Sequence, residues 1–301
     1  MDRLELLNKT KLFVLDMDGT FYLGNRILEG SLDFLRAVEK AGKRYVFFTN
    51  NSSQSPEKYI DKLAKMNCHI TRDQIMTSGD VMISYLDTYY KGKSVYLLGT
   101  EPLIKSFKDA GINLINDQVK NYKDQKASEI GDPDDDDYLW CERNAYDYME
   151  EGIVTPDIVV VGFDKTLTYE SLTRACNYIR NGALFLATHL DINCPVEGGF
   201  IPDCGAMCAA ITLSTGVKPT YVGKPFAQTA DMVERLTGVD KSGITFVGDR
   251  LYTDVATGVN NGAMGVLVLS GEATMEDVDK SDVKPDAIFD SIGEMGKLIR
   301  Q

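Results

Sequence analysis

Histidine and paired cysteine are scarce in this sequence. Only two histidines occur in 301 residues, and the six cysteines show neither C-x-x-C pairs nor zinc-type Cys/His spacing. These absences exclude a structural zinc site and a disulfide framework, so we expect reduced and mostly buried thiols. A chain of this length that is 44% hydrophobic can bury a proper core without such devices.

Long apolar runs and clusters of positive charge are also missing. No basic head precedes an apolar run at the N-terminus, and no segment approaches the roughly 20 apolar residues that a membrane span needs. The formal net charge is −13, whereas nucleic-acid backbones are bound by clustered lysine and arginine. We therefore expect a cytoplasmic protein that binds neither membranes nor nucleic acids, although a small phosphate could bind locally.

Short apolar strands alternate with helical segments near both ends of the chain. This rhythm predicts an α/β fold with a doubly wound, Rossmann-like parallel sheet, to which both ends contribute. The predicted strands of this core cover residues 12–16, 44–50, 220–224, 245–249 and 266–271.

The middle of the chain holds material for a second α/β domain. We expect a core formed by residues 1–91 and 218–301, with a domain inserted at 92–217. Residues 118–156 break the rhythm with the acidic run GDPDDDD followed by an aromatic-rich stretch. The run lacks the alternating ligands, central glycine and closing glutamate of an EF-hand, so it predicts a solvated loop rather than a calcium site.

Polar residues of complementary types follow four of the predicted core strands. Ligands of open α/β sheets bind beyond the carboxyl ends of the strands, so these segments can converge on one crevice. The residues are Asp16 and Asp18, Thr49 with Asn50 and Asn51, Lys224, and Asp249 with Asp254.

These residue types suit the chemistry of phosphate esters. A carboxylate that attacks phosphorus needs a cation beside it, and Mg²⁺ prefers hard oxygen ligands such as the carboxylates of Asp16 and Asp249 and a backbone carbonyl, for example that of Asp18. Lys224 supplies a fixed positive charge, and the side chains of residues 49–51 can donate hydrogen bonds to the phosphoryl group.

Two carboxylates then take different parts in the reaction. We expect Asp16 to attack phosphorus and form an aspartyl phosphate, and Asp18 to protonate the leaving alcohol and later deprotonate water. Three of the four motifs also have a structural interpretation: Thr49 and Asn50 could form a turn, Lys224 could start a helix, and Asp249 with Asp254 could cap one. The joint occurrence of all four motifs favours catalysis.

Four motifs resemble those of the haloacid dehalogenase superfamily in the same order along the chain. They are DMDGT (16–20), FFTNN (47–51), VGKP (222–225) and GDRLYTD (248–254). The insert between the second and third motifs resembles subfamily IIA, the NagD-like and p-nitrophenyl-phosphatase-like enzymes with a C2-type cap, and residues 199–216 are similar to the end of that cap.

The resemblance implies a role for each matching residue. It implies that Asp16 is the nucleophile and a magnesium ligand, that Asp18 is the acid/base and a carbonyl ligand, and that Asp249 is a metal ligand. It further implies phosphate binding by Thr49, by Asn50 or Asn51, and by Lys224. Asp254 would orient a metal-bound water or Lys224. The chain departs from the family pattern at residues 118–156, a segment that looks longer than a compact cap of this type needs.

We therefore expect a magnesium-dependent phosphatase that acts on a small phosphorylated metabolite. A phosphomutase with the same intermediate and a non-catalytic phosphate-binding protein are the alternatives. The inserted domain could supply a homodimer surface, and its loop 188–200 is the segment expected to contact the leaving group. His189 in this loop is either a substrate contact or an ordinary loop histidine.

Overall fold

The computed structural model of the protein describes residues 2–117, 155–196 and 198–299. The acidic run and the aromatic stretch after it lie outside the described residues. The chain divides into two compact units, a core unit formed by residues 1–85 with 222–301, and an inserted unit formed by residues 86–221. The expected limits of the insertion, residues 92 and 217, both fall within the inserted unit.

A six-stranded sheet forms the centre of the core unit, with the order β14-β13-β12-β1-β4-β5 and parallel pairing throughout. The first strand, β1, pairs on one side with β4 from the first part of the chain and on the other side with β12 from the last part. Leu12 is in register with Arg44 of β4 and with Ile244 of β12. Both ends of the chain thus build one sheet, as predicted. Its strands are β1 (Leu12–Leu15), β4 (Arg44–Thr49), β5 (Ile75–Thr77), β12 (Ile244–Gly248), β13 (Met264–Val268) and β14 (Ala287–Phe289).

Helices cover both faces of this sheet because its strands are apolar on both faces. Along β13, Val266 and Val268 join the core that contains α1, α2, α3 and α13, whereas Leu267 faces a second cluster with Val255 and Val278. The helices of the core unit are α1 (Arg3–Lys9), α2 (Ser31–Lys40), α3 (Pro56–Lys65), α10 (Ala227–Thr237), α11 (Ala256–Val259), α12 (Met275–Lys280) and α13 (Ile292–Leu298), and α4 (Ser78–Tyr89) crosses into the inserted unit.

Shorter elements complete the core unit. A hairpin of two short antiparallel strands follows β1, and a π-helical turn follows β12. Single π-type turns are frequent at functional sites. These elements are β2 (Tyr22–Leu23) and β3 (Arg26–Ile27), the 3₁₀ turns η1 (Arg72–Gln74) and η2 (Lys241–Gly243), and the π-turn η3 (Leu251–Val255).

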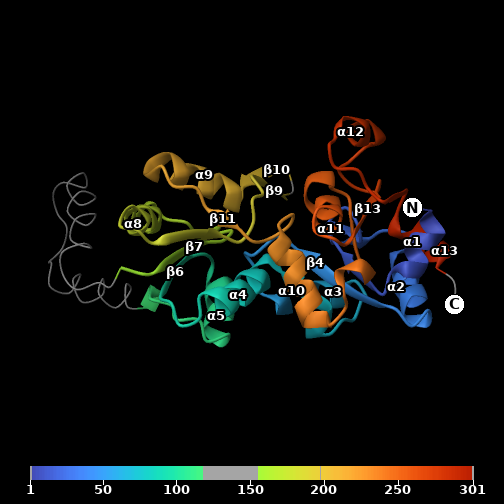
Figure 1. Ribbon diagram of the computed structural model, residues 1–301, viewed down its shortest axis with the longest axis horizontal. Coiled ribbons are helices and arrows are strands. Elements are labelled where there is room, and N and C mark those ends of the chain that lie inside the picture. The colour runs from blue at the N-terminus through green and yellow to red at the C-terminus, as the bar shows by residue number, and fades with distance from the viewer. Residues whose placement is uncertain (1, 118–154, 197, 300–301) are drawn as a thin grey trace. The chain divides into compact units, whose positions relative to one another are not determined.

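The inserted unit has its own four-stranded parallel sheet, β11-β8-β7-β6, and a separate antiparallel hairpin. Helices α8 and α9 pack together over one face of this sheet, as Figure 1 shows. The elements are β6 (Val95–Leu98), α5 (Glu101–Asp109), β7 (Ile158–Val161), α8 (Tyr169–Arg180), β8 (Leu184–Ala187), the hairpin strands β9 (Asn193–Val196) and β10 (Gly199–Pro202), α9 (Cys204–Thr215) and β11 (Thr220–Tyr221).

The strand predicted at residues 220–224 belongs to the other sheet. Only Thr220 and Tyr221 form a strand, β11, and they pair with Leu186 and Ala187 of β8 in the inserted unit. The prediction of a core strand here was wrong, because a short apolar run does not specify which sheet edge will pair with it. The core unit resumes at residue 222.

Two composition-based expectations can be compared with the described residues. All five cysteines described are free thiols, and four of them are buried, as expected. Within the same residues, no helix combines the length and the apolarity that crossing a bilayer would require.

The ring of Phe47 on β4 is a sensitive position for core stability. Phe47 is fully buried and meets the ring of Phe21 edge-to-face, with the ring centroids 4.8 Å apart. The Phe47→Ala substitution should lower the free energy of unfolding by about 3–5 kcal/mol, because it leaves a cavity in a packed core. Urea denaturation followed by circular dichroism measures this change.

The matched control is Leu236→Ala on α10, where the leucine is 57% exposed. This variant should change the free energy of unfolding by no more than about 0.5 kcal/mol. Equal losses in the two variants would contradict the assignment of Phe47 to the core.

Candidate active site

Three adjacent core strands bring together residues that are far apart in the sequence. Asp16 follows β1, Thr49 ends β4 and Asp249 follows β12, and β1 pairs with both of the other strands. The strands are parallel, so all three residues lie at the same edge of the sheet. Lys224 joins them from the segment after β11, since its Nζ lies 2.7 Å from Oδ1 of Asp16.

A buried lysine lies between two carboxylates at this edge. Lys224 is 3% exposed, and its ammonium group donates hydrogen bonds to Oδ1 of Asp16 and to Oδ1 of Asp254, which lies in the π-turn η3. Burial by itself would lower the pKa of Lys224, but Asp16 and Asp254 outweigh burial and raise the pKa above its ordinary value. The side chain therefore stays positively charged at physiological pH.

The carboxylates at the site outnumber the lysine. Burial raises the pKa of Asp16 well above its usual range; Lys224 opposes this shift, and the charges of Asp254 and Asp249 add to it. Burial, followed by the charge of Asp254, raises the pKa of Asp249 to about 6. Both shifts have one cause, since three carboxylates out of bulk water share one ammonium group. A further cation would favour the ionised forms of Asp16 and Asp249 at neutral pH.

One oxygen of this cluster has no hydrogen-bond partner among the described residues. Oδ2 of Asp249 accepts the backbone N–H of Glu272 at 2.8 Å, but Oδ1 is buried and unpaired within the described part of the chain. Carboxylate oxygens of Asp16, Asp249 and Asp254 all lie within 4.8 Å of one another. Hard oxygen ligands in such a group suit Mg²⁺, so these residues fit a magnesium ion.

Two glycines allow the backbone to pass close to Asp249. A Cβ at Gly19, where φ is +79°, would lie 2.3 Å from Oδ2 of Asp249, and a Cβ at Gly271 would lie 2.0 Å from the same oxygen. The hydroxyl of Ser270 also donates a hydrogen bond of 2.7 Å to the carbonyl of Gly19. The glycine of DMDGT is thus required both by its backbone conformation and by the space that Asp249 occupies.

The second motif holds Lys224 by its backbone. Oδ1 of Asn50 accepts the N–H of Lys224 at 2.9 Å, and Nδ2 of Asn50 donates to the Lys224 carbonyl at 3.2 Å. Oγ1 of Thr49 accepts the N–H of Asn51, while Oδ1 of Asn51 accepts from both the N–H and the hydroxyl of Ser53. Asn50 therefore positions Lys224, a contact that the sequence analysis did not foresee.

Asp18 lies beyond the end of β1, next to the hairpin β2–β3. It forms an isolated β-bridge with Tyr22, and the N–H of Gly19 donates a hydrogen bond of 2.9 Å to the Tyr22 carbonyl. Partial removal from water raises the pKa of Asp18, and the charge of Lys62 opposes this shift. A raised pKa allows this carboxyl to hold a proton closer to neutral pH, as a general acid must.

Sequence reasoning missed three residues near Asp18. The charge of Arg250 acts on Asp18, and Nε of Arg250 lies 2.8 Å from Oε2 of Glu272. Nζ of Lys62, on α3, lies 3.9 Å from the ring centroid of Tyr22. Arg250 could have been found from its place inside the GDRLYTD motif. Lys62 and Tyr22 had no such signal, since lysine on a helix and tyrosine near a strand are commonplace.

Comparisons with known proteins agree with this geometry. A family profile described as "Haloacid dehalogenase-like hydrolase" matches residues 13–113, and a second profile, HAD-hydrolase-like, matches residues 221–295. An acid sugar phosphatase of Staphylococcus aureus (strain MRSA252) is 30% identical over 96% of this chain and 97% of its own length. The chain belongs to the haloacid dehalogenase-like hydrolases.

Solved structures specify the branch of this hydrolase family. A 4-nitrophenylphosphatase from Thermotoga maritima is 40% identical, with a TM-score of 0.81 over 98% of this chain and 99% of that chain. NagD from E. coli K-12 is 26% identical, with a TM-score of 0.76 over 95% of this chain and 98% of that chain. These similarities confirm three predictions: the chain belongs to the NagD-like branch, it has an α/β fold, and it is a phosphatase.

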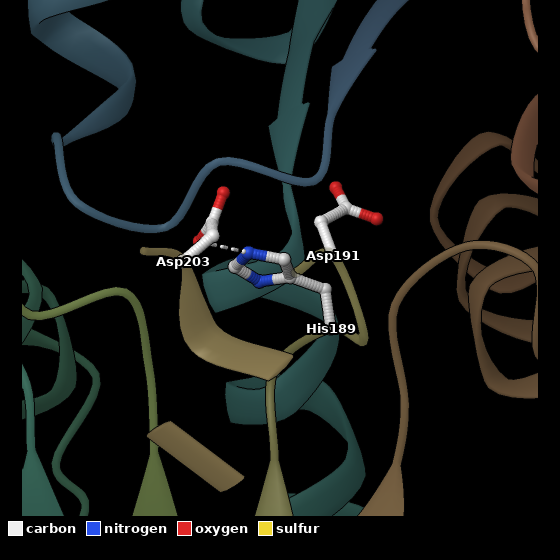
Figure 2. A group of neighbouring side chains, drawn as sticks. All are labelled: His189, Asp191 and Asp203. Atoms are coloured by element: carbon white, nitrogen blue, oxygen red, sulfur yellow. Dashed lines mark hydrogen bonds and ion pairs between the residues drawn. The ribbon is translucent and has the colours of Figure 1, made fainter. Parts of the chain in front are cut away.

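The hydrolase also has a buried polar cluster within its inserted unit (Figure 2). Nε2 of His189 lies 2.9 Å from Oδ1 of Asp203, and Nδ1 lies 2.9 Å from the hydroxyl of Thr188. Burial by itself would lower the pKa of His189, but negative partners, foremost Cys204, raise it to about 9. Asp203 also accepts the N–H of Cys204 and so caps α9. His189 is thus fully buried and hydrogen-bonded to its neighbours, and a contact with substrate stays a prediction.

Magnesium should stabilise this hydrolase more at about pH 7.5 than at about pH 5, because its ligands must be ionised to bind it. In metal-free protein, the raised pKa values of Asp16 and Asp249 mean that the folded state binds protons more tightly than the unfolded state. That part of the stability is therefore lost as the pH rises from about 4 through about 6. Thermal unfolding in chelator and in excess Mg²⁺ at both pH values measures the difference.

The Asp249→Asn variant is the control for this measurement. It removes one charged ligand with little change of shape, so the Mg²⁺-dependent rise in melting temperature should largely disappear. A rise of equal size at both pH values, or one that survives in the variant, would show that Mg²⁺ binds elsewhere.

Proposed function

We propose that this hydrolase is a magnesium-dependent phosphatase that cleaves small phosphate monoesters through a phosphorylated aspartate. The observation that carries the proposal is the ammonium group of Lys224, which is buried between Asp16 and Asp254 and next to the partly unpaired carboxylate of Asp249. A phosphoryl group carries negative charge on its oxygens, so a carboxylate can attack it only among positive charges. The site has one fixed cation and the ligands for another.

Asp16 is the proposed nucleophile. Its Oδ1 accepts a hydrogen bond of 2.7 Å from the Lys224 ammonium group, which restrains the carboxylate. Attack forms a bond between Asp16 and phosphorus and breaks the ester bond to the leaving oxygen. Water then displaces Asp16 from phosphorus, so that one difficult hydrolysis proceeds in two easier steps.

Asp18 is the proposed acid and base. In the first step its protonated carboxyl gives the proton to the leaving oxygen, and in the second its carboxylate takes a proton from the attacking water. The raised pKa of Asp18 and its exposed position beyond β1 support this assignment. The proton balance closes, because Asp18 regains in the second step the proton that it gave in the first.

Lys224, with the side chains of Thr49 and Asn51, is proposed to bind the phosphoryl oxygens. Asn50 contributes through its two hydrogen bonds to the backbone of Lys224. Asp254 contributes through its contact with the Lys224 ammonium. Both residues thus hold the Lys224 ammonium group in place. It therefore needs little reorganisation when negative charge shifts on the phosphoryl oxygens during the reaction.

The carboxylates of Asp16 and Asp249 and the backbone carbonyl of Asp18 are the proposed ligands of the magnesium ion. Mg²⁺ bound there supplies positive charge that offsets the repulsion between the Asp16 carboxylate and the phosphoryl oxygens. The buried, unpaired Oδ1 of Asp249 supports this ligand set. Oδ2 of the same residue is fixed by the N–H of Glu272, so the ligand is already oriented.

The substrate class follows in part from relatives of known activity. They are an acid sugar phosphatase and a 4-nitrophenylphosphatase, so sugar phosphates and aryl phosphates are the first probes for this chain. We propose that loop 188–200 of the inserted domain, residues 92–217, contributes to selectivity among small phosphorylated metabolites. Exchanging the residues of this loop should change the ranking of substrates in a panel, and an unchanged ranking would contradict this role.

A cytoplasmic location and a homodimer formed through the inserted domain complete the proposal. The free thiols support the first, because reduced cysteines persist in the cytosol. Light scattering of the purified protein determines the oligomeric state.

The Asp16→Asn variant should lose at least about 1,000-fold in kcat, because it lacks the nucleophile. Release of inorganic phosphate from p-nitrophenyl phosphate and from a panel of sugar phosphates, with Mg²⁺ and with chelator, measures the loss. Asp33→Asn is the matched control, since Asp33 is an exposed aspartate on α2 that forms an ion pair with Arg36 on the same surface.

Three outcomes separate the candidate functions. Phosphate release that requires both Mg²⁺ and Asp16 supports the phosphatase. Transfer of the phosphoryl group to a second hydroxyl of the sugar, seen by NMR without release of phosphate, would instead show a phosphomutase. Binding of phosphate esters with no turnover of any panel member would show a non-catalytic protein.

A further inference from the structure

The loop after β8 lies against the start of α9 and is bonded to it through the backbone. The N–H of Asp203 donates a hydrogen bond of 2.8 Å to the Ile192 carbonyl. The N–H of Gly205 donates to the Asp191 carbonyl at the same distance. Glycine is needed for this approach, because a Cβ at Gly205 would lie 2.1 Å from the carbonyl oxygen of Leu190.

The side chains of His189 and Asp203 connect the same two segments (Figure 2). The thiol of Cys204 donates to the Val161 carbonyl at 3.4 Å, and the hydroxyl of Thr188 donates to that sulfur at 3.7 Å. The Thr188 oxygen is thus left to accept from Nδ1 of His189, whose Nε2 faces Oδ1 of Asp203. An imidazole that donates from both nitrogens is protonated, so its bond to the Asp203 carboxylate is charge-assisted.

This pair is buried, whereas the apolar side chains further along the loop are not. His189 and Asp203 are both buried, but Ile192 is 55% exposed and Phe200 is 74% exposed. Removing either member of the pair would leave the other buried without its partner, which costs more than the loss of a surface contact. The pair therefore restrains a loop that these apolar side chains do not hold by packing.

We propose that His189 and Asp203 are positioning residues that fix loop 188–200 on α9 and thereby set its selectivity among leaving groups. The inference rests on the proposed function, in which this loop contributes to selectivity. The pair acts through the loop backbone, without contact between either side chain and the substrate. A displacement of about 1 Å in a group that positions a substrate can lower the rate about 100-fold, so a loosened loop should discriminate less.

The Asp203→Ser variant, assayed with Mg²⁺ present, tests this role. Serine still caps α9 but is too short to reach His189, so the variant removes the pair and keeps the cap. For the sugar phosphate hydrolysed fastest in the panel, kcat/KM should fall about 10-fold, mainly through a higher KM. For acetyl phosphate, whose leaving group is only acetate, the change should stay below about 3-fold. Equal losses on the two substrates would overturn the proposal.

Variants of His189 test the other member of the pair. His189→Leu should cause the same loss on the sugar phosphate as Asp203→Ser. His189→Gln should restore most of it, because the glutamine amide can still donate a hydrogen bond to Asp203. If the two residues act as one pair, combining His189→Leu with Asp203→Ser should add little to either loss. A double variant whose loss is the product of the two single losses would contradict the pairing.

Thr168→Ala is the matched control for a general loss of stability. Thr168 caps α8, another helix of the inserted unit, and its side chain accepts the N–H of Ser171. This variant should lower the melting temperature but leave the ratio of the two kcat/KM values unchanged. A ratio that changes as much as in Asp203→Ser would reduce the effect to stability and overturn the proposal.

Hydrogen exchange measures the position of the loop without any activity. Amides in peptides that cover residues 188–194 should exchange faster in Asp203→Ser and in His189→Leu than in the wild type, and at the wild-type rate in Thr168→Ala. Unchanged exchange in the first two variants would defeat this inference alone. Absence of Mg²⁺-dependent turnover in the wild type would defeat the proposed function, and the selectivity role with it.

Discussion

One buried ammonium group, that of Lys224, is the interaction on which the active site depends. A buried charge is strongly destabilising unless it is paired, and Lys224 meets this requirement through Asp16 and Asp254. Its backbone is held in turn by the side-chain amide of Asn50 at the end of β4. The pairing therefore joins segments from both ends of the chain at one edge of the sheet, and it holds the carboxylate of Asp16, the proposed nucleophile.

The same pairing leaves the site short of positive charge. Asp16, Asp249 and Asp254 share one lysine, so the pKa values of Asp16 and Asp249 are raised and one oxygen of Asp249 has no partner among the described residues. A folded protein maintains such an arrangement only where something else compensates for it. Magnesium fits that need, and with it the two positive charges needed to place a carboxylate beside a phosphoryl group are complete. The close approach of Gly19 and Gly271 to Asp249 shows how tightly the backbone surrounds the ligand.

The proposed acid, Asp18, lies apart from this charged cluster. It follows the end of β1, where its backbone forms a β-bridge with Tyr22 of the hairpin β2–β3, and Lys62 of α3 lies over the Tyr22 ring. The proposed nucleophile, Asp16, is thus held by an ion pair with Lys224, whereas the proposed acid, Asp18, is exposed. A second buried polar pair, His189 with Asp203, joins a loop of the inserted unit to the start of α9.

The sequence by itself determined the apolar strands, the polar residues that end them and hence the family, because strand periodicity and motif spacing are local properties of the chain. The expected meeting of Asp16, Lys224 and Asp249 at one edge of the sheet agrees with the structure, and the chemical roles of these residues and of Asp18 stay predictions. Tertiary structure alone decided that residues 220–221 join the inserted sheet, that Asn50 bonds the backbone of Lys224, and that Lys62 lies over Tyr22. Each of these contacts joins segments that are distant in the sequence, and only the packing of the folded chain fixes the distance between them.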